Sequence, residues 1–259
     1  MDAVRIGQAA RAGERLLSEE LERLAPTYGA KVLNNLLLHV EPGITARLGH
    51  VIVDRFGALI IDARVAEGAV VIGSEAERRW KARHPDGQTH EFVNPLVRSR
   101  EHETVVRQAL RETGNWFGPD YVRSAVVFSD ADLSELTLDP RARAHVLDVS
   151  EVDTLLRERP HTAPHGGSLS DSQVAGLAGL FRGLDHSGDP WALQAHAETL
   201  LHELMPERHA LLMHREKPQV EHVDHGITYH WECLGGDALV GKVSITVDRT
   251  GQLLGLHGA

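Results

Sequence analysis

The stretch GHVIVDRFGALIIDAR, residues 49–64, consists of two apolar runs on either side of a turn. Both runs are rich in β-branched residues, and residues 54–57 favour a turn, so the stretch predicts a β-hairpin. Alternate side chains of a strand share a face, which places Asp62 and Arg64 side by side at the end of the second run. An acid and a base in this position indicate either a buried ion pair or the remains of a metal site.

The register of this hairpin decides which residue lies across from Asp62. If Val53 pairs with Ala58 across the turn, antiparallel counting places Gly49 directly opposite Asp62. Asp54 is a candidate substitute ligand, but its place in the turn predicts that it faces solvent.

Two helices are expected to bring further charged groups to this hairpin. Residues 3–24 predict an amphipathic helix, with Glu14 on the same stripe as its buried leucines. A buried carboxylate without a partner is costly, so Glu14 is expected to meet other polar groups. Asn94 and a following proline predict the start of a second helix, which runs to about residue 112. Its side chains Arg98 and His102 lie one turn apart and are candidates to join the site.

The remaining patterns predict a mixed sheet with helices on its faces, an α/β or α+β fold. Further strands are expected at 31–38, 70–72, 124–128 and 145–149, and a long loop with a turn at 85–87 is expected over 74–93. A short helix should end at Pro160. We therefore expect a first domain over residues 1–160.

A second, smaller domain is expected over residues 171–259, after a linker at 161–170 that is rich in glycine, proline and histidine. Helices are predicted at 170–184 and 190–204, and strands at 209–214, 227–234, 238–248 and near 256. This order predicts a small α+β unit with an antiparallel meander.

Residues 10 to about 158 resemble the nuclease-related (NERD) domain, a branch of the restriction-endonuclease-like PD-(D/E)xK superfamily. The markers, in order, are Gly13-Glu14 on the first helix, the hairpin with His50, the Gly57 turn, Asp62-Ala-Arg64, Asn94-Pro95 and the strand Val126-Val-Phe128. The resemblance implies a restriction-endonuclease-like sheet and a four-part metal-dependent site.

Only one of the four parts matches the pattern that the resemblance implies. Glu14 corresponds to the family's first-helix glutamate, but Gly49 stands where the family has an aspartate. Asp62 and Arg64 replace the family's glutamate and lysine, and Arg98 replaces its glutamine. With Asp62 and Glu14 nearby, a bidentate salt bridge from Arg64 is the expected replacement for the metal.

These departures predict a catalytically impaired domain, a pseudoenzyme that binds nucleic acid or a protein partner in DNA processing. No cofactor is expected in that case, and DNA, a second copy of the chain or another protein are the candidate partners. The alternative is an active DNA nuclease in which Glu14 and Asp62 hold Mg²⁺ or Mn²⁺ and Arg64 stabilises phosphate charge.

The composition describes an ordinary globular protein that does not favour non-specific polyanion binding. The formal net charge is −10, and 25% of the residues are charged. Arg78, Arg79, Lys81 and Arg83 are candidates for a local basic groove, although a solvated charged face is the ordinary interpretation. The single cysteine, the absence of an apolar leader and the absence of a long apolar run predict a cytoplasmic protein.

A histidine-rich segment near the end of the chain suggests a zinc site or a pH sensor. Its candidate ligands are His222, His225, His230 and Cys233. His230 and Cys233 are three residues apart, so a strand would direct them to opposite faces, and exposed histidines beside a core cysteine are the ordinary interpretation.

Overall fold

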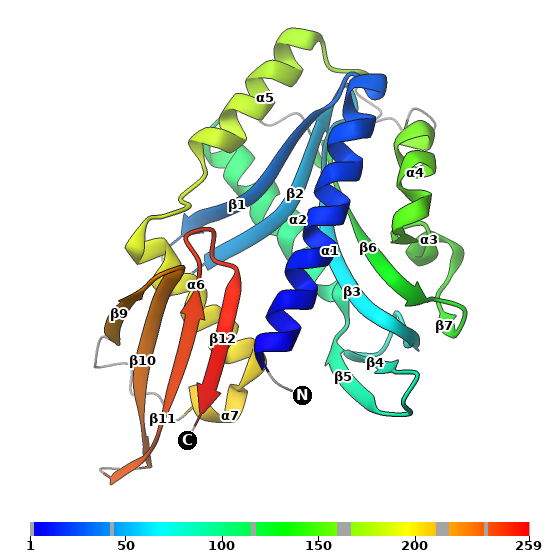
Figure 1. Cartoon of the computed structure of the whole chain (residues 1–259). Coiled ribbons are helices and arrows are strands. Elements are labelled where there is room, and N and C mark those ends of the chain that lie inside the picture. The colour runs from blue at the N-terminus through cyan, green and yellow to red at the C-terminus, as the bar shows by residue number, and fades with distance from the viewer. Residues whose placement is uncertain are drawn as a thin grey trace. The chain divides into compact units, whose positions relative to one another are not determined.

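A computed structural model describes residues 3–41, 44–114, 118–159, 167–210, 218–235 and 238–258 (Figure 1). Its chain forms two compact units. The larger unit comprises Ala9–Asn34 and Leu48–Gly183, and the smaller unit comprises Met1–Gln8, Asn35–Arg47 and Leu184–Ala259. These units divide the chain differently from the single boundary expected at 161–170, because β1 and β2 contribute residues to both. Most of the expected linker, residues 160–166, lies outside the described residues.

The larger sheet has eight strands and is mixed, which confirms the predicted fold class. Its strands are β1 (Lys31–Glu41), β2 (Ile44–Asp54), β3 (Gly57–Ser74), β4 (Arg79–Arg83), β5 (Thr89–Val93), β6 (Val122–Asp132), β7 (Leu136–Thr137) and β8 (Val146–Asp148). The order β1-β2-β3-β4-β5 forms the main path, and β6 pairs in parallel with both β3 and β8. The accompanying helices are α1 (Ala3–Leu24), α2 (Pro95–Glu112), α3 (Pro140–Arg143), α4 (Val152–Glu158) and α5 (Asp171–Gly183).

The predicted hairpin register is confirmed. Val53 pairs with Ala58 and His50 pairs with Ile61. Gly57 has a φ of 101°, and a Cβ there would overlap the backbone of Tyr121, so the turn requires glycine for two independent reasons.

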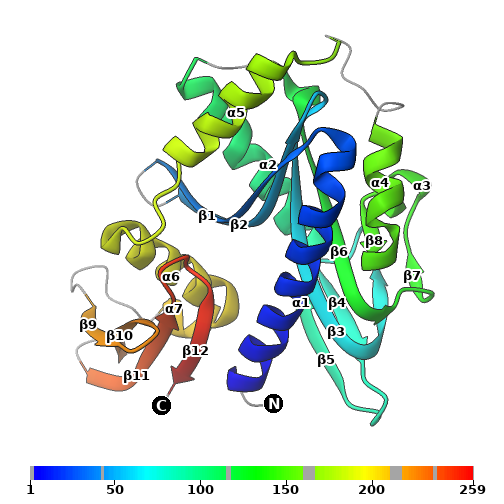
Figure 2. The ribbon, with the colours of Figure 1, turned by 45° about the horizontal axis from the view of Figure 1, so that its top comes forward.

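Two apolar layers cover the two faces of this sheet. On one face α1 and α4 pack on β3 through a cluster that includes Leu17, Leu21, Leu59, Ile61 and Leu156. A second cluster, with Trp80, Leu96, Val126, Phe128 and Val146, includes the first turn of α2. Helices α1 and α2 thus lie on opposite faces of the sheet (Figures 1 and 2).

Two expectations for the middle of the chain need correction. Residues 70–72 form a strand as predicted, but not a separate one: they continue β3, which passes through an irregularity where Glu67 and Gly68 have positive φ. The long loop predicted over 74–93 is instead the β4–β5 hairpin, although its turn lies at Pro85–Gly87 as expected. Trp80 is fully buried and anchors β4 to the core.

The smaller unit contains an antiparallel sheet in the order β12-β11-β10-β9. Its elements are α6 (Pro190–Leu204), α7 (Pro206–His209), β9 (Gln219–Val223), β10 (Gly226–Gly235), β11 (Ala238–Val247) and β12 (Leu253–Gly258). The strand predicted at 209–214 is wrong at its start, where His209 ends α7, and residues 211–214 lie outside the described residues. β9 was not predicted.

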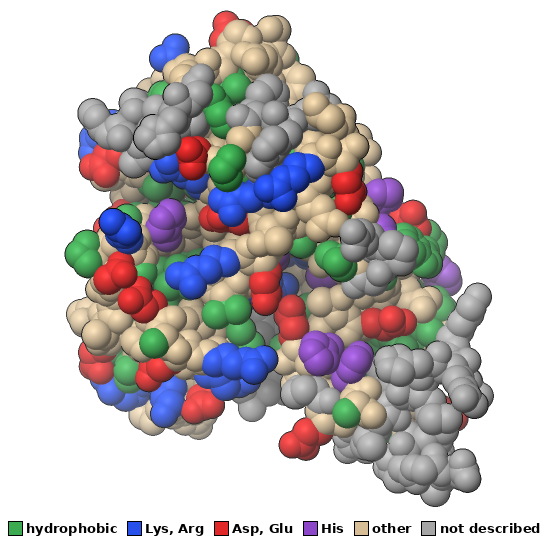
Figure 3. Space-filling view, turned by 180° about the vertical axis from the view of Figure 1, so that it is seen from behind, with side chains coloured by type: hydrophobic (Ala, Val, Ile, Leu, Met, Phe, Trp, Pro, Cys, Tyr) green, Lys and Arg blue, Asp and Glu red, His purple; other side chains and the backbone are tan. Residues whose placement is uncertain are grey.

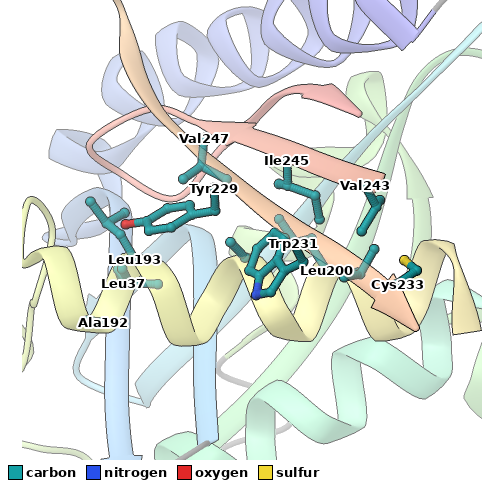
Figure 4. Close-up of a cluster of buried hydrophobic side chains, with 12 residues drawn as sticks. Leu37, Ala192, Leu193, Leu200, Tyr229, Trp231, Cys233, Val243, Ile245 and Val247 are labelled. Carbon is teal, nitrogen blue, oxygen red and sulfur yellow. The ribbon is translucent and has the colours of Figure 1, made fainter. Parts of the chain in front are cut away.

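The core of this unit lies between α6 and the sheet (Figure 4). Tyr229, Trp231 and Cys233 share the buried face of β10, as their alternation predicts. Helix α6 contributes Leu193 and Leu200, so its apolar stripe and the strand alternation meet in one layer.

Within the described part of the chain, no helix is long and apolar enough to cross a membrane.

Candidate functional site

Helix α2 is held along β3 by its first residues. The Asn94 side chain accepts a hydrogen bond from the Leu96 backbone N–H and donates to the backbone carbonyl oxygens of Ser74 and Glu77. One side chain thus caps α2 and ties it to the end of β3, which confirms the predicted helix start. As a result, the buried stripe of α2 faces the sheet.

This placement brings His102 of α2 into contact with Asp62 of β3. His102 Nδ1 lies 3.0 Å from Asp62 Oδ1, and the two residues are only 5% and 7% exposed. This contact lacks hydrogen-bond geometry, and both His102 Nδ1 and the other carboxylate oxygen, Oδ2, are buried without a hydrogen-bond partner among the described residues. Arg64 therefore does not form a bidentate bridge with Asp62, because that bridge would occupy both carboxylate oxygens.

Three basic side chains act on the Asp62 carboxyl. Burial raises its pKa, but the charges of His102, Arg64 and Arg98 and the contact with His102 outweigh burial and hold the pKa below its usual value. Arg64 and Arg98 are both half-buried. The structure thus brings together Asp62, Arg64 and Arg98 as expected, with His102 as the direct partner of the acid.

Gly49 faces this acid from the neighbouring strand. The His50–Ile61 pair, extended by one residue, places Gly49 opposite Asp62. A Cβ built at Gly49 would come no closer than 3.6 Å to another atom, the backbone oxygen of Ile61. The Cβ of a larger residue would therefore fit at position 49. A lack of space for a Cβ does not explain why this position has no acid.

These residues are a poor match for Mg²⁺, which takes near-octahedral oxygen ligands and usually one or two carboxylates. Asp62 offers one carboxylate, and His102 already occupies one of its oxygens. Gly49 offers no side-chain ligand, and the charges of Arg64 and Arg98 oppose a cation. Across the described ranges, no group of three or more His, Cys, Asp or Glu side chains is arranged to hold a metal ion.

Glu14 approaches β3 from the other face of the sheet. It lies on α1 beside Gly13, where a Cβ would overlap the side chain of Val65 on β3. The helix is therefore pressed against the strand that carries Asp62, and the Glu14 side chain is half-buried. However, α1 covers the face of Leu59 and Ile61, whereas Asp62 meets α2.

His50 belongs to the same face as Glu14. It pairs with Ile61, is almost completely buried, and donates through Nδ1 to Asn34 Oδ1 at 2.8 Å. Asn34 in turn donates to Ser18 of α1 at 2.9 Å. This polar connection joins α1, β1 and β2 beneath the hairpin.

Asp54 does not face solvent, which corrects the sequence-based expectation. It is 3% exposed, and the Arg159 guanidinium donates to both of its oxygens, at 2.6 and 2.8 Å. Asp54 also accepts from the backbone N–H of Phe56 at 2.7 Å. It is therefore a structural residue of the hairpin, not a substitute metal ligand.

Sequence reasoning missed Ser99, a buried polar residue next to the site. Ser99 lies one turn before His102 on the buried stripe of α2, and its hydroxyl oxygen has no hydrogen-bond partner among the described residues. The sequence did contain a signal for it: Ser99 and His102 fall on the same helical stripe as the apolar residues Val106 and Ala109.

The candidate basic groove does not stand out as a basic surface. Arg79, Lys81 and Arg83 alternate with buried residues along β4 and face outward. Arg79 and Lys81 pair with Glu91, and Arg83 pairs with Glu135. Figure 3 likewise shows basic and acidic side chains interspersed on the face seen from behind.

The four candidate zinc ligands near the end of the chain do not lie on one face of the smaller sheet. Cys233 is buried in the core, whereas His230 lies on the other face and contacts Glu221 Oε2 at 3.2 Å. The predicted division of these two residues between opposite faces is confirmed. His222 lies on β9 opposite Ile227, and His225 lies in the following turn.

Comparisons with known proteins agree with this architecture. The family model of the nuclease-related domain matches residues 9–129. An uncharacterized protein of Bacillus anthracis is 28% identical over 102 residues, which are 39% of this chain and 47% of that protein. The chain therefore spans about half the length of this curated relative.

No solved structure matches the chain. The matched segment runs from α1 to β6 and contains Glu14, Gly49, Asp62, Arg64, Arg98 and His102. Residues 9–129 of the chain are therefore similar to the nuclease-related domain.

Proposed function

We propose that the nuclease-related domain binds nucleic acid without hydrolysing it and serves as a binding module in DNA processing. The observation that carries this proposal is the 3.0 Å contact between Asp62 and His102. It engages the acid at the position where the family resemblance implies a metal ligand, while Gly49 leaves the opposing position without an acid.

The charges around Asp62 support binding more than catalysis. Hydrolysis of a phosphodiester by this class of site needs a divalent ion that orients water and offsets charge. Here Arg64 and Arg98 carry permanent charge, and a guanidinium presents planar donors that match phosphate oxygens. Their charges favour an anion at the same place where they oppose a metal ion.

The proposal is tested by measuring cleavage and binding on the same preparations. Single- and double-stranded DNA are incubated with the protein in Mg²⁺, in Mn²⁺ and without metal, and fluorescence anisotropy reads binding over a series of salt concentrations. We expect no metal-dependent cleavage, and binding that weakens with salt and is reduced by Arg64→Gln or Arg98→Gln.

A restored variant provides the matched positive control. Gly49→Asp, Asp62→Glu, Arg64→Lys and Arg98→Gln together install the residues that the family resemblance implies, and a Cβ fits at position 49. Cleavage by this variant, but not by the wild type, would show that the scaffold is competent and the native site is impaired.

Two outcomes would overturn the proposal. Wild-type cleavage that requires metal and is lost in Asp62→Ala would favour the alternative, an active nuclease using Glu14, Asp62 and Arg64. Absence of DNA binding at every salt concentration would remove the nucleic-acid role. Light scattering on the same samples would then show whether the partner is a second copy of the chain.

A further inference from the structure

Two histidines at the end of the β4–β5 hairpin are in direct contact. His84 Nε2 and His90 Nδ1 are 2.8 Å apart, and the centroids of the two rings are 4.8 Å apart. Both side chains are half-buried. Nothing in the proposed nucleic-acid function uses this pair, which lies on strands separate from Asp62.

The pairing of the strands explains why these rings meet. His90 lies opposite Ala82, and the His84 backbone N–H donates to the Gln88 carbonyl oxygen where the hairpin turns. His84 directly follows β4 and lies two residues after Ala82, so if the extended alternation continues it points to the same face as Ala82 and His90. The two rings are therefore diagonal neighbours across the hairpin.

A carboxylate lies beside them on β3. Extending the Val70–Arg83 pair by one residue places Ala69 opposite His84, and a Cβ at Gly68 would lie 3.8 Å from Pro85. Glu67 precedes this glycine, and its charge acts on His90. The side chain of Glu67 is exposed, so it can rotate towards the two rings.

Glu67 also has an unusual backbone conformation. Its φ is 48°, in the left-handed region that residues other than glycine rarely adopt. Such strain persists only where the surrounding structure imposes it, and it is concentrated at functional positions. The irregularity in β3 places this acid at the end of the histidine hairpin.

We propose that His84 and His90 bind a zinc-like divalent transition-metal ion, with Glu67 as the third protein ligand. Imidazole is a preferred ligand for Zn²⁺, Ni²⁺ and Cu²⁺, and a carboxylate completes many such sites. Two zinc-bound nitrogens at about 2.0–2.1 Å and tetrahedral angles are roughly 3.3 Å apart, so the observed pair has to open by only about 0.5 Å.

The protonation states suit metal binding. Burial lowers the pKa of His90, and the charge of His84 lowers it further, while Glu67 acts in the opposite direction. The neutral imidazole, which is the form that binds metal, is therefore favoured. One of the two contacting nitrogens carries the shared proton, and tautomerisation of that ring moves the proton to its other nitrogen when the ion replaces the hydrogen bond.

The two histidines alone supply two ligands, and no third ligand is in place: the described residues contain no group of three or more His, Cys, Asp or Glu side chains arranged to hold a metal ion. Rotation of Glu67 supplies the missing ligand, and water fills the fourth position. The site is therefore completed on binding, and its affinity depends on rotation of the exposed Glu67 side chain.

The test is calorimetric titration of the tag-free, full-length protein with Zn²⁺, because a histidine tag would itself bind the ion. We expect one saturable site per chain, and affinity reduced about tenfold or more by His84→Ala or His90→Ala. Glu67→Gln should reduce affinity less. The control His225→Ala, an exposed histidine of the smaller unit, should leave the titration unchanged.

A second measurement separates binding at the hairpin from binding elsewhere. Zn²⁺ should raise the Tm of the wild type and of His225→Ala but not of His84→Ala, whose fold is checked by circular dichroism. Wild-type affinity in both hairpin histidine variants, or no saturable binding by the wild type, would overturn the proposal.

Discussion

The contact between Asp62 and His102 makes a quantitative prediction about stability. Both side chains are more than nine-tenths buried, and their atoms Oδ1 and Nδ1 are 3.0 Å apart. His102→Ala leaves the Asp62 carboxylate buried without its contacting partner, which typically costs about 3–5 kcal/mol. For a protein of this size, a loss of about 3 kcal/mol lowers Tm by roughly 6–12 °C.

The assay is a double-mutant cycle with His102→Ala, Asp62→Ala and the double variant, unfolded by urea at neutral pH. Residues in direct contact typically couple by about 0.5–3 kcal/mol, so the sum of the two single losses should exceed the double loss by an amount in this range. The exposed pair Lys242–Glu232 is the matched control, with an expected coupling of about 0–1 kcal/mol.

The pH dependence of this coupling has a definite sign. Because the folded-state pKa of Asp62 lies below its usual value, its stabilisation is present above the unfolded-state pKa of about 3.9. It is lost as the pH falls through the lower folded-state pKa. A coupling no larger than that of the control pair at neutral pH would refute the assignment of His102 as the partner of Asp62.

Three further results are expected. Asp54→Ala or Arg159→Ala should lower the free energy of unfolding by about 3–5 kcal/mol in urea titrations, because each leaves a buried charge without its partner; an unchanged midpoint would contradict this. Gly13→Val should cost about 1–3 kcal/mol through overlap with Val65, and Val65→Ala in the same background should recover part of the loss. Burial, with the nearby Asp189 charge, raises the pKa of Tyr229 to about 12, so its phenolate absorbance should appear late in an alkaline titration and be missing in Tyr229→Phe. The stabilisation from the neutral phenol is complete below pH about 10 and is lost between about 10 and 12, so ionisation near pH 10 would contradict its burial.

Local signals predicted the elements that position the candidate site. Asn94 followed by proline marked the first turn of α2, because capping chemistry acts within a few residues. The turn at Gly57 and the alternation of apolar residues predicted the Val53–Ala58 pairing, because the length of a turn sets the register of the strands beside it. The alternation in β10 likewise separated Cys233 from His230.

The β4–β5 hairpin was missed because its outer face is strongly charged. Trp80 and Ala82 are its only buried side chains, and the outward-facing Lys81 and Arg83 of β4 form ion pairs with Glu91 of β5 and with Glu135. A short strand of this kind has the composition of a loop. The strand is held instead by a tertiary contact, the burial of Trp80 in the core.

The sequence alone predicted the first helix, the β2–β3 hairpin, the start of α2, the face of β3 that carries Asp62, and the absence of an acid at Gly49. The tertiary structure decided which charged groups meet. His102 and Asp62, and Arg159 and Asp54 at a separation of 105 residues, come from elements far apart in the chain. Periodicity and capping are set by neighbouring residues, whereas the partner of a buried charge is set by the packing of helices against the sheet.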